Sequence, residues 1–574
     1  MALTKVTYSM IDGEAANITD YGASTSSADN TVAIQAAFDA NDVVYLPEGT
    51  FITKLIEPNR TKVIVYGPGK LQLKQGEFSE IILIGADVEY IQVEGVEFIG
   101  NKANTTATNP ALRKRLLNAE SPLAFAVVRD CVFHGSNYGG FSIDGKFVTI
   151  ERNYVYDCGY AAGVGDGISV VSYNPERVVI QNNIVLDAAD YGIAVDAVNV
   201  VVQNNYVKGA LSAGMGSLAR GATGAYSDLG VNMKYIGNTV IDCNNPMEFF
   251  CTPGENTSGF IGLEVSENYI SGGTSTNPAL FITRNSGGYN PAGSYIYIEN
   301  NTILIAGNID QAIGVIGQGA FWETTNFVID GNVMDSYKGM TISSARDFVL
   351  TNNVMRTTSG LRGFTIDKCK QFIINDNIID GYSAAILSTN SSGTIQNNSY
   401  YNIATDALRL WGGQYTVNEV FKGIPNRVVW VSVTNDSAVF QDNVELRGYL
   451  SFQDCGASGS PLWISDPTTL GSIYIALEAL MNYPDVNATI TDCPYFQTPG
   501  NTAVRFEAKV AEGCKLASNP VASTLRISSG VPTSGYWRAG TKVTYTEPVS
   551  AGYIGSVCTT AGTSGTWKSY GLIT

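Results

Sequence analysis

Apolar and polar positions alternate in short segments along most of the chain, and the same order of segments returns many times. "RVVIQNNIVLDAADYGIAVD" at residues 177–196 shows it: an alternating apolar segment, an Asn, a second short segment, a loop and a third segment. Alternation with a period of two is typical of strands that bury one face. In this copy the pattern predicts Val179, Ile184, Ile193 and Val195 as inward-facing residues.

The Asn of this pattern recurs every 21–33 residues, which predicts a solenoid. The interval has a floor near 21 residues and a variable excess, as expected for coils that share strands and differ in their loops. Asn suits the turn because it tolerates left-handed backbone and can hydrogen-bond along a stack. Coils stacked ~4.8 Å apart would bury a core that no single coil has. The sequence therefore predicts an all-β, parallel β-helix. The series is Asn153, Asn183, Asn205, Asn238, Asn268, Asn301, Asn332, Asn353, Asn377 and Asn398, with Asp130 and Glu94 extending it backwards.

Composition excludes several partners and cofactors. The formal net charge of −17 argues against nucleic acid or an anionic membrane surface, and no apolar run approaches the ~20 residues of a membrane span. The N-terminus lacks the apolar core of a signal peptide, and the nine cysteines form no C-x-x-C pair, which favours buried thiols in a protein made in a reducing cytoplasm. His134 is the only histidine and no DxDxDG-type loop occurs, so we expect no metal and no cofactor.

Both ends of the chain resemble a known family. "DYGASTSSADNTVAIQAAFDANDVVYLPEGTF" (residues 20–51) resembles the opening of the pectate-lyase-like superfamily, in the form found in bacteriophage tailspikes and tail-fibre depolymerases. "SGVPTSGYWRAGTKVTYTEPVSAGYIGSVCTTAGTSGTWKSYGLI" is similar to the ending of tailspikes from phages of encapsulated Gram-negative bacteria such as Acinetobacter. The resemblance implies a right-handed β-helix in a homotrimeric virion tail spike, made in the host cytoplasm, that contacts other tail proteins and binds and cuts capsular polysaccharide. It also implies either a spike without its virion-anchoring head or a short spike docked through an adaptor.

Four regions follow from these patterns. Residues 1–50 hold a capping helix with Val32, Ala33, Ala36 and Ala37 on its apolar side, and residues 51–425 form the catalytic and receptor-binding β-helix. Past roughly Gly423 the Asn period ends, so residues 426–525 are predicted to form a separate β domain. Residues 526–574 form a β-rich tail for trimerisation or carbohydrate contact, with aromatic side chains at Trp537, Tyr553 and Trp567.

The apolar pairs that end each coil fix which residues face outward. The residues between and just after the pairs form two outward rows, which include Glu248 and Asp196. Two acidic loop residues, Asp166 and Asp190, lie next to the same strands, so four carboxylates gather in the middle coils. Glycoside hydrolysis needs a carboxylic acid and a second carboxylate. We assign Glu248 as general acid and Asp196 or Asp190 as base, about two coils or ~10 Å apart, which favours inversion. Asp166 is a further catalytic candidate. The expected sugar contacts are Tyr191, Phe250, Phe281, Arg284 and Trp322.

Two other functions stay open on the sequence. A polysaccharide lyase of the same fold would need a base such as Arg220, Arg284 or Tyr226, and its unsaturated product would absorb near ~235 nm. A receptor-binding adhesin of the same fold would bind capsule without cutting it and would leave no halo on a lawn of encapsulated cells.

Overall fold

The computed structural model divides into two compact units, Met1–Ala306 (unit 1) and Gly307–Thr574 (unit 2). It describes residues 15–102, 114–119, 123–160, 165–171, 176–220, 230–252, 260–273, 276–284, 293–305, 311–317, 324–426, 428–432, 444–453, 462–465, 473–479, 495–497, 504–510, 526–528, 531, 539–540, 542–545, 548–560 and 566–573.

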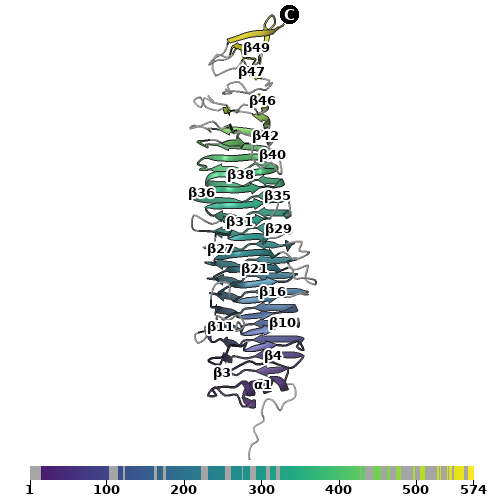
Figure 1. Ribbon diagram of the computed structural model, residues 1–574, viewed down its shortest axis with the longest axis vertical. Coiled ribbons are helices and arrows are strands. Elements are labelled where there is room, and N and C mark those ends of the chain that lie inside the picture. The colour runs from purple at the N-terminus through teal and green to yellow at the C-terminus, as the bar shows by residue number, and fades with distance from the viewer. Residues whose placement is uncertain are drawn as a thin grey trace, which may run out of the picture. The chain divides into compact units, whose positions relative to one another are not determined.

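Unit 1 is a parallel β-helix in which strands of successive coils pair in three columns (Figure 1). The first column is β2 (Val43–Tyr45), β4 (Lys62–Tyr66), β7 (Tyr90–Glu94), β10 (Leu123–Arg129), β13 (Gly145–Glu151), β16 (Arg177–Gln181), β19 (Val200–Gln203), β22 (Met233–Ile236), β26 (Glu264–Ser266) and β29 (Gly293–Glu299). The second is β3 (Thr50–Thr53), β5 (Lys70–Leu73), β8 (Glu97–Ile99), β11 (Val132–Ser136), β14 (Tyr154–Cys158), β17 (Ile184–Leu186), β20 (Tyr206–Lys208), β23 (Thr239–Ile241), β27 (Tyr269–Ser271) and β30 (Thr302–Leu304). The third is β6 (Ile82–Ile84), β9 (Leu117–Ala119), β12 (Phe141–Ile143), β15 (Ile168–Val171), β18 (Tyr191–Asp196), β21 (Ala213–Arg220), β24 (Asn245–Thr252) and β28 (Leu280–Arg284).

The apolar pairs predicted to face the core are confirmed in every coil. Each of these side chains is at most 1% exposed: Ile168/Val170, Ile193/Val195, Met247/Phe249, Leu280/Ile282, Met340/Ile342, Phe364/Ile366 and Leu408/Leu410. One inward assignment nearby is wrong, because Ile184 is 43% exposed and Val185 is buried instead. Val179 is buried, as predicted, between Val178 and Ile180. The turn before Ile184 resets the alternation, so counting through it assigns the wrong face.

The predicted Asn series forms a buried hydrogen-bond ladder. In unit 1 each Asn Oδ1 accepts hydrogen bonds from the backbone N–H of the preceding ladder residue and, from Asn153 onward, from its side-chain Nδ2, at 2.9–3.0 Å, up to Asn301. The same contacts run from Asn332 to Asn398 in unit 2. The backward extension is wrong: Cys131 occupies the ladder position before Asn153, and Glu94 pairs in register with Arg129 on the outer face.

Left-handed backbone and ladder bonding belong to two adjacent residues. The residue before the ladder Asn has the positive φ, 56° at Asn182 and 55° at Asn204, while Asn183 and Asn205 make the ladder bonds. Asp130, with φ of 55°, takes this position one residue before Cys131. A repeated Asn-Asn or Gly-Asn pair thus divides the two tasks.

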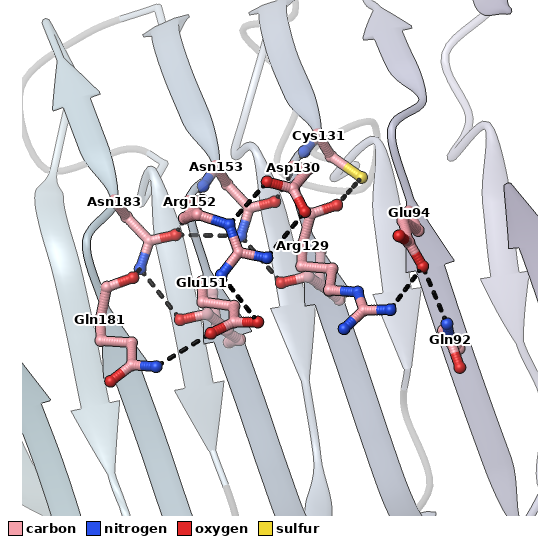
Figure 2. Close-up of polar contacts among 12 residues, drawn as sticks. Gln92, Glu94, Arg129, Asp130, Cys131, Glu151, Arg152, Asn153, Gln181 and Asn183 are labelled. Atoms are coloured by element: carbon pink, nitrogen blue, oxygen red, sulfur yellow. Dashed lines mark hydrogen bonds and ion pairs between the residues drawn. The ribbon is translucent and has the colours of Figure 1, made fainter. Parts of the chain in front are cut away.

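Figure 2 shows the ladder beside the outer polar row on β7, β10, β13 and β16. Asn153 donates to Asn183 Oδ1, and both side chains are buried. On the outer face Arg129 donates to Glu94 at 2.8 Å, and Gln181 donates to Glu151 at 2.9 Å. Such exposed pairs are each worth ~0–1 kcal/mol, so the buried ladder is the stronger determinant of coil register.

A helix begins unit 1, as predicted, but it buries a different face. α1 (Thr31–Ala40) follows β1 (Ala16–Asn17) and η2 (Ile18–Tyr21) and lies beside β3 at the purple end of Figure 1. It buries Ile34, Ala37 and Phe38, whereas Val32 is 84% exposed. The i, i+3, i+4 spacing of the larger side chains sets the buried face, and the alanines follow it. No helix among the described residues has the length and hydrophobicity to cross a membrane.

Unit 2 continues the parallel pairing with longer strands. One column of paired strands in unit 2 is named the outer column. It contains β31 (Gln311–Ile316), β34 (Lys338–Ser343), β36 (Val354–Asp367), β38 (Ile378–Gln396), β40 (Asp406–Lys422), β41 (Val429–Ser432), β43 (Leu462–Ser465) and β45 (Tyr495–Gln497). The remaining parallel strands are β32 (Thr324–Asp330), β33 (Val333–Asp335), β35 (Ala345–Thr351), β37 (Lys370–Asn375), β39 (Ser399–Tyr401), β42 (Val444–Gln453), β44 (Ile473–Ala479), β46 (Val504–Val510) and β47 (Arg526–Ser528).

Parallel pairing crosses the predicted boundary at residue 426. β40 pairs with β42, β42 with β44 and β44 with β46, so the described strands continue the stack where the sequence predicts a separate β domain. β48 (Lys542–Tyr545), β49 (Tyr553–Thr560) and β50 (Thr566–Leu572) then pair antiparallel. The domain limits at residues 50, 425 and 525 stay predictions.

Candidate active site

The third column of unit 1 places Glu248 on an outward row. In register along this row lie Ser169, Ala194, Gly216, Glu248 and Phe281. The strands of Ala194 and Glu248 are therefore two coils apart, as the sequence predicts. Part of the segment expected to be a long loop, residues 210–229, is strand: it contains β21, while residues 221–229 lie outside the described part of the chain.

Glu248 is a largely buried carboxyl with two hydrogen-bond donors on one oxygen. It is 9% exposed, Tyr191 donates its hydroxyl to Oε2 at 3.1 Å, and Asn245 donates Nδ2 to the same oxygen at 3.4 Å. Among the described residues Oε1 has no hydrogen-bond partner. Burial raises the pKa of Glu248, the Asp190 charge adds to the rise, and the two donors oppose it. Glu248 is thus held toward its protonated form with Oε1 left free.

Small residues make room for this arrangement. Ala213 lies in register between Tyr191 and Asn245, so the Tyr191 side chain can reach across one coil to Glu248. Gly216 lies directly beside Glu248, and any side chain there would collide with the Glu248 carbonyl oxygen. A larger residue at either position would separate the tyrosine from the carboxyl.

The charges of Asp190 and Asp196 act on the same tyrosine. Burial raises the pKa of Tyr191, and the charges of Glu248, Asp190 and Asp196 raise it further. Asp196 is 7% exposed, and its charge also raises the pKa of the buried Tyr235. The hydroxyl of Tyr191 therefore stays protonated and serves as a donor to Glu248.

Asp166 extends the cluster by one coil. Its Oδ1 accepts the Tyr191 backbone N–H at 3.4 Å, and its Oδ2 lies 3.7 Å from Arg115 Nη2. Burial raises the pKa of Asp166 to about 6, with Asp190 adding to the rise and Arg115 opposing it. The charge of Asp190 thus acts on both Asp166 and Glu248, and the pKa of each of these two carboxyl groups is raised.

The residues predicted to contact sugar differ in their exposure. Tyr191 is a correction: it is 5% exposed and contributes its hydroxyl, so it offers no open ring face for stacking. Phe250 and Phe281 are half-buried on β24 and β28, and Phe281 is in register with Glu248. Trp322 and the side chain of Arg284 lie outside the described part of the chain.

Asn245 and Arg115 are site residues that sequence reasoning missed. Asn245 is the first residue of β24 and lies in the same register row as Tyr191. It stands two positions before the apolar pair Met247/Phe249. Tyr191 and Asp166 occupy the same place in their own coils. The position two residues before each inward pair could therefore have indicated Asn245 from the sequence. Arg115 contacts Asp166 from a preceding coil, and no local spacing indicates it.

Two family models match the chain. Residues 79–258 match the right-handed β-helix region, and residues 254–422 match the periplasmic copper-binding protein NosD. The described residues do not fit a copper site, because no three His, Cys, Asp or Glu side chains among them gather in a position to hold a metal ion. A comparison with curated protein sequences finds no significant match.

Solved structures share the fold at low sequence identity. The N-terminal fragment of gene product 12 of bacteriophage Phi29 is 13% identical, with 97% of this chain and 96% of that chain covered and a TM-score of 0.51. A double mutant of the E. coli bacteriophage HK620 tailspike in complex with a pentasaccharide is 13% identical over 68% of this chain and 78% of that chain, with a TM-score of 0.48. The catalytic unit of a GH87 α-1,3-glucanase from Streptomyces thermodiastaticus is 14% identical over 71% and 68%, with a TM-score of 0.36. The chain is a right-handed β-helix protein whose fold resembles that of the Phi29 gene product 12 fragment.

Proposed function

We propose that the protein binds a bacterial capsular polysaccharide and depolymerises it by glycosidic-bond hydrolysis. The observation that carries the proposal is Glu248: a carboxyl with a raised pKa on an outward row, with Asp190 and Asp196 close to its hydrogen-bond donor Tyr191. The resemblance of both chain ends to phage tailspikes supports the substrate class.

In the proposed reaction Glu248 is the general acid. Its Oε1 gives a proton to the glycosidic oxygen as the bond to the anomeric carbon breaks. Asp190 or Asp196 accepts a proton from the water that attacks the opposite face of that carbon. The strands that carry acid and base are two coils apart, ~10 Å between backbones. Side chains that lean toward each other would bring the carboxyl groups to ~6.5–9.5 Å, the separation that inversion requires.

We further propose that the protein is a homotrimeric spike of a virion tail, made in the host cytoplasm and docked on other tail proteins. Exposed apolar side chains in the second column of unit 1 and the antiparallel tail support assembly of several copies.

Glu248→Gln tests the proposed acid. The amide keeps the shape and removes the proton, so release of reducing ends from purified capsule should fall by ~10²-fold or more, with capsule binding and thermal stability nearly unchanged. The matched control is Glu264→Gln, which removes a surface partner of Lys234 and should cut normally. A Glu248→Gln protein that cuts at the wild-type rate would place the chemistry elsewhere. A wild-type product that absorbs near ~235 nm would identify a lyase instead.

A further inference from the structure

Unit 2 carries a group of cations on its outer column. Lys338 on β34 and Arg362 on β36 are in register, and the same column continues through Ala384 to Asp406. Arg409 lies three residues after Asp406 on β40, in the row that leads to Trp430. The small, buried Ala384 leaves the space between Arg362 and Asp406 free of a large side chain.

Arg409 is fixed in place by the chain itself. Its Nε and Nη2 donate to Asp406 Oδ2 at 2.7 and 2.6 Å, and Nη2 also donates to Thr405 Oγ1 at 3.1 Å. The guanidinium lies over the Trp430 ring at 5.4 Å, and Trp430 meets Trp411 edge-on at 5.2 Å. The charge of the fully buried Asp406 is thus matched by Arg409.

Arg362 has no such compensation. Among the described residues it has no carboxylate partner and no side-chain hydrogen bond, although it is half-buried. Burial lowers the pKa of Arg362, and the nearby Arg409 charge lowers it further. Lys338, the neighbour in register, likewise has no ion pair among these residues. Arg362 thus has a cation on each side, Lys338 in register on the neighbouring strand and Arg409 beyond Ala384, and a bound anion would stabilise this arrangement.

We propose that Lys338, Arg362 and Arg409 form a subsite for an anionic group on a sugar, a carboxylate or a phosphate. The ligand class rests on the proposed function, because it makes the bound polymer a glycan. A planar guanidinium recognises both anions through paired N–H donors, and the neighbouring Trp430 offers a ring for an adjacent sugar. Nucleic acid is disfavoured, because three cations on a chain of net charge −17 are too few for a polymer that carries a charge on every nucleotide.

The test measures binding of three probes to the full-length protein by ligand-observed NMR: trigalacturonate, glucose 6-phosphate and neutral maltotriose. We expect at least one charged probe to bind, inorganic phosphate to compete with it, and raised salt to weaken it. Binding of trigalacturonate identifies a carboxylate site, and binding of the sugar phosphate alone identifies a phosphate site. Arg362→Gln should weaken binding by about ten-fold or more, the loss expected for charge-assisted hydrogen bonds.

Arg356→Gln is the matched control, because Arg356 is an exposed arginine on the same strand, β36, flanked in register by Asp335 and Asp380. It should bind the charged probe as the wild type does. Arg362→Lys keeps the charge and should retain part of the affinity, which covers the case in which Arg362→Gln does not fold. Glu248→Gln should bind normally, so failure of catalysis and failure of this subsite give different results.

Three outcomes would overturn the subsite. One is a wild-type protein that binds neither charged probe, and another is equal binding by Arg362→Gln. The third is an Arg362→Gln protein whose mass in solution drops while probe binding persists, because the anion would then come from a second copy of the chain.

Discussion

At the residue scale, Glu248 owes its protonation to the balance of two opposed effects. Burial and the Asp190 charge disfavour the carboxylate, whereas hydrogen bonds from Tyr191 and Asn245 favour it. Burial is the larger, so the net effect is a raised pKa. Because both donors meet at Oε2, the same bonds would stabilise the carboxylate that remains once Oε1 has lost its proton in the proposed reaction. In that reaction Tyr191 is a positioning residue that acts through Glu248.

Tyr191→Phe should change the pH profile of cutting. The hydroxyl lowers the pKa of Glu248, so removing it should raise that pKa. The proposed mechanism needs protonated Glu248 and predicts loss of activity as pH rises through its pKa, so the alkaline limb of kcat should move to higher pH by about one unit or less. The value of kcat should fall about ten-fold while KM changes little, because Oε2 loses a donor to the product carboxylate.

Tyr154→Phe is the control for this change, because Tyr154 is exposed on β14 and has no contact with the site residues. It should leave the profile unchanged. If Tyr191→Phe lowers the rate and leaves the alkaline limb where it was, the tyrosine has a packing role only.

Sequence alone could locate Glu248 but not its environment. The alternation around Met247 and Phe249 fixes the direction of the side chain within one strand, and the structure agrees. The partners of Glu248 come from Tyr191 two coils away and from an Asn at the start of its own strand. Whether the Tyr191 ring is exposed or packs toward Glu248 depends on the small size of Ala213, which lies in register between Tyr191 and Asn245. The repeat pattern of the sequence does not contain this information.

At the element scale, the buried ladder sets the coil geometry and ends in a different residue. Past Asn398 the ladder position belongs to Glu419 on β40, whose Oε1 accepts Asn398 Nδ2 at 2.7 Å and the Tyr400 hydroxyl at 3.0 Å. The sequence correctly predicts the end of the Asn series, because the repeated letter disappears. It misses that the hydrogen bonds continue through a carboxyl group, since a Glu does not match the repeat.

Glu419→Gln should change how stability depends on pH. Burial raises the pKa of Glu419 to about 7 from 4.5, so the folded state holds this proton more tightly than the unfolded chain does. The stability from this group is full below about pH 4.5 and is lost as pH rises through 7, by roughly 2–3 kcal/mol. The uncharged Gln removes that loss. The wild-type unfolding temperature should therefore fall more steeply than that of the variant between pH 5 and 8, as measured by scanning calorimetry.

Equal slopes of unfolding temperature against pH for the two proteins would contradict this prediction. They would mean that ionisation of Glu419 costs little stability, because the Asn398 and Tyr400 donors outweigh burial.

At the scale of the whole molecule, the scaffold repeats while the chemistry varies. The residue two positions before the inward pair is Tyr191 or Asn245 in unit 1 and Lys338 or Arg362 in unit 2, although the buried pairs beside them are alike. The core selects apolar residues of similar size in every coil, so outward positions are free to differ. A β-helix can thus carry an acidic site in one unit and a basic group in the other without a change of core.

An exposed apolar row on unit 1 supports the prediction that the protein assembles as a homotrimer. The outer face of the second column in unit 1 exposes Tyr154, Ile184 and Tyr269 in the same register row, between 38% and 43% exposed. A row of exposed apolar side chains is stabilised by contact with another surface. A homotrimer related by rotation would cover this row in each copy. Light scattering should give three times the chain mass of 61.3 kDa.

Ile184→Lys and Tyr269→Lys together test whether this row is the contact. Two charges placed on it should weaken the trimer and raise the monomer fraction at micromolar concentration, because an unpaired buried charge is costly. Lysines at Phe125 and Tyr297, which are exposed on β10 and β29 of the first column, should leave the trimer intact. A wild-type protein that is monomeric at that concentration would refute the trimer. A stable trimer in the double variant would move the contact to another face, with the antiparallel strands β48 to β50 as the next candidate.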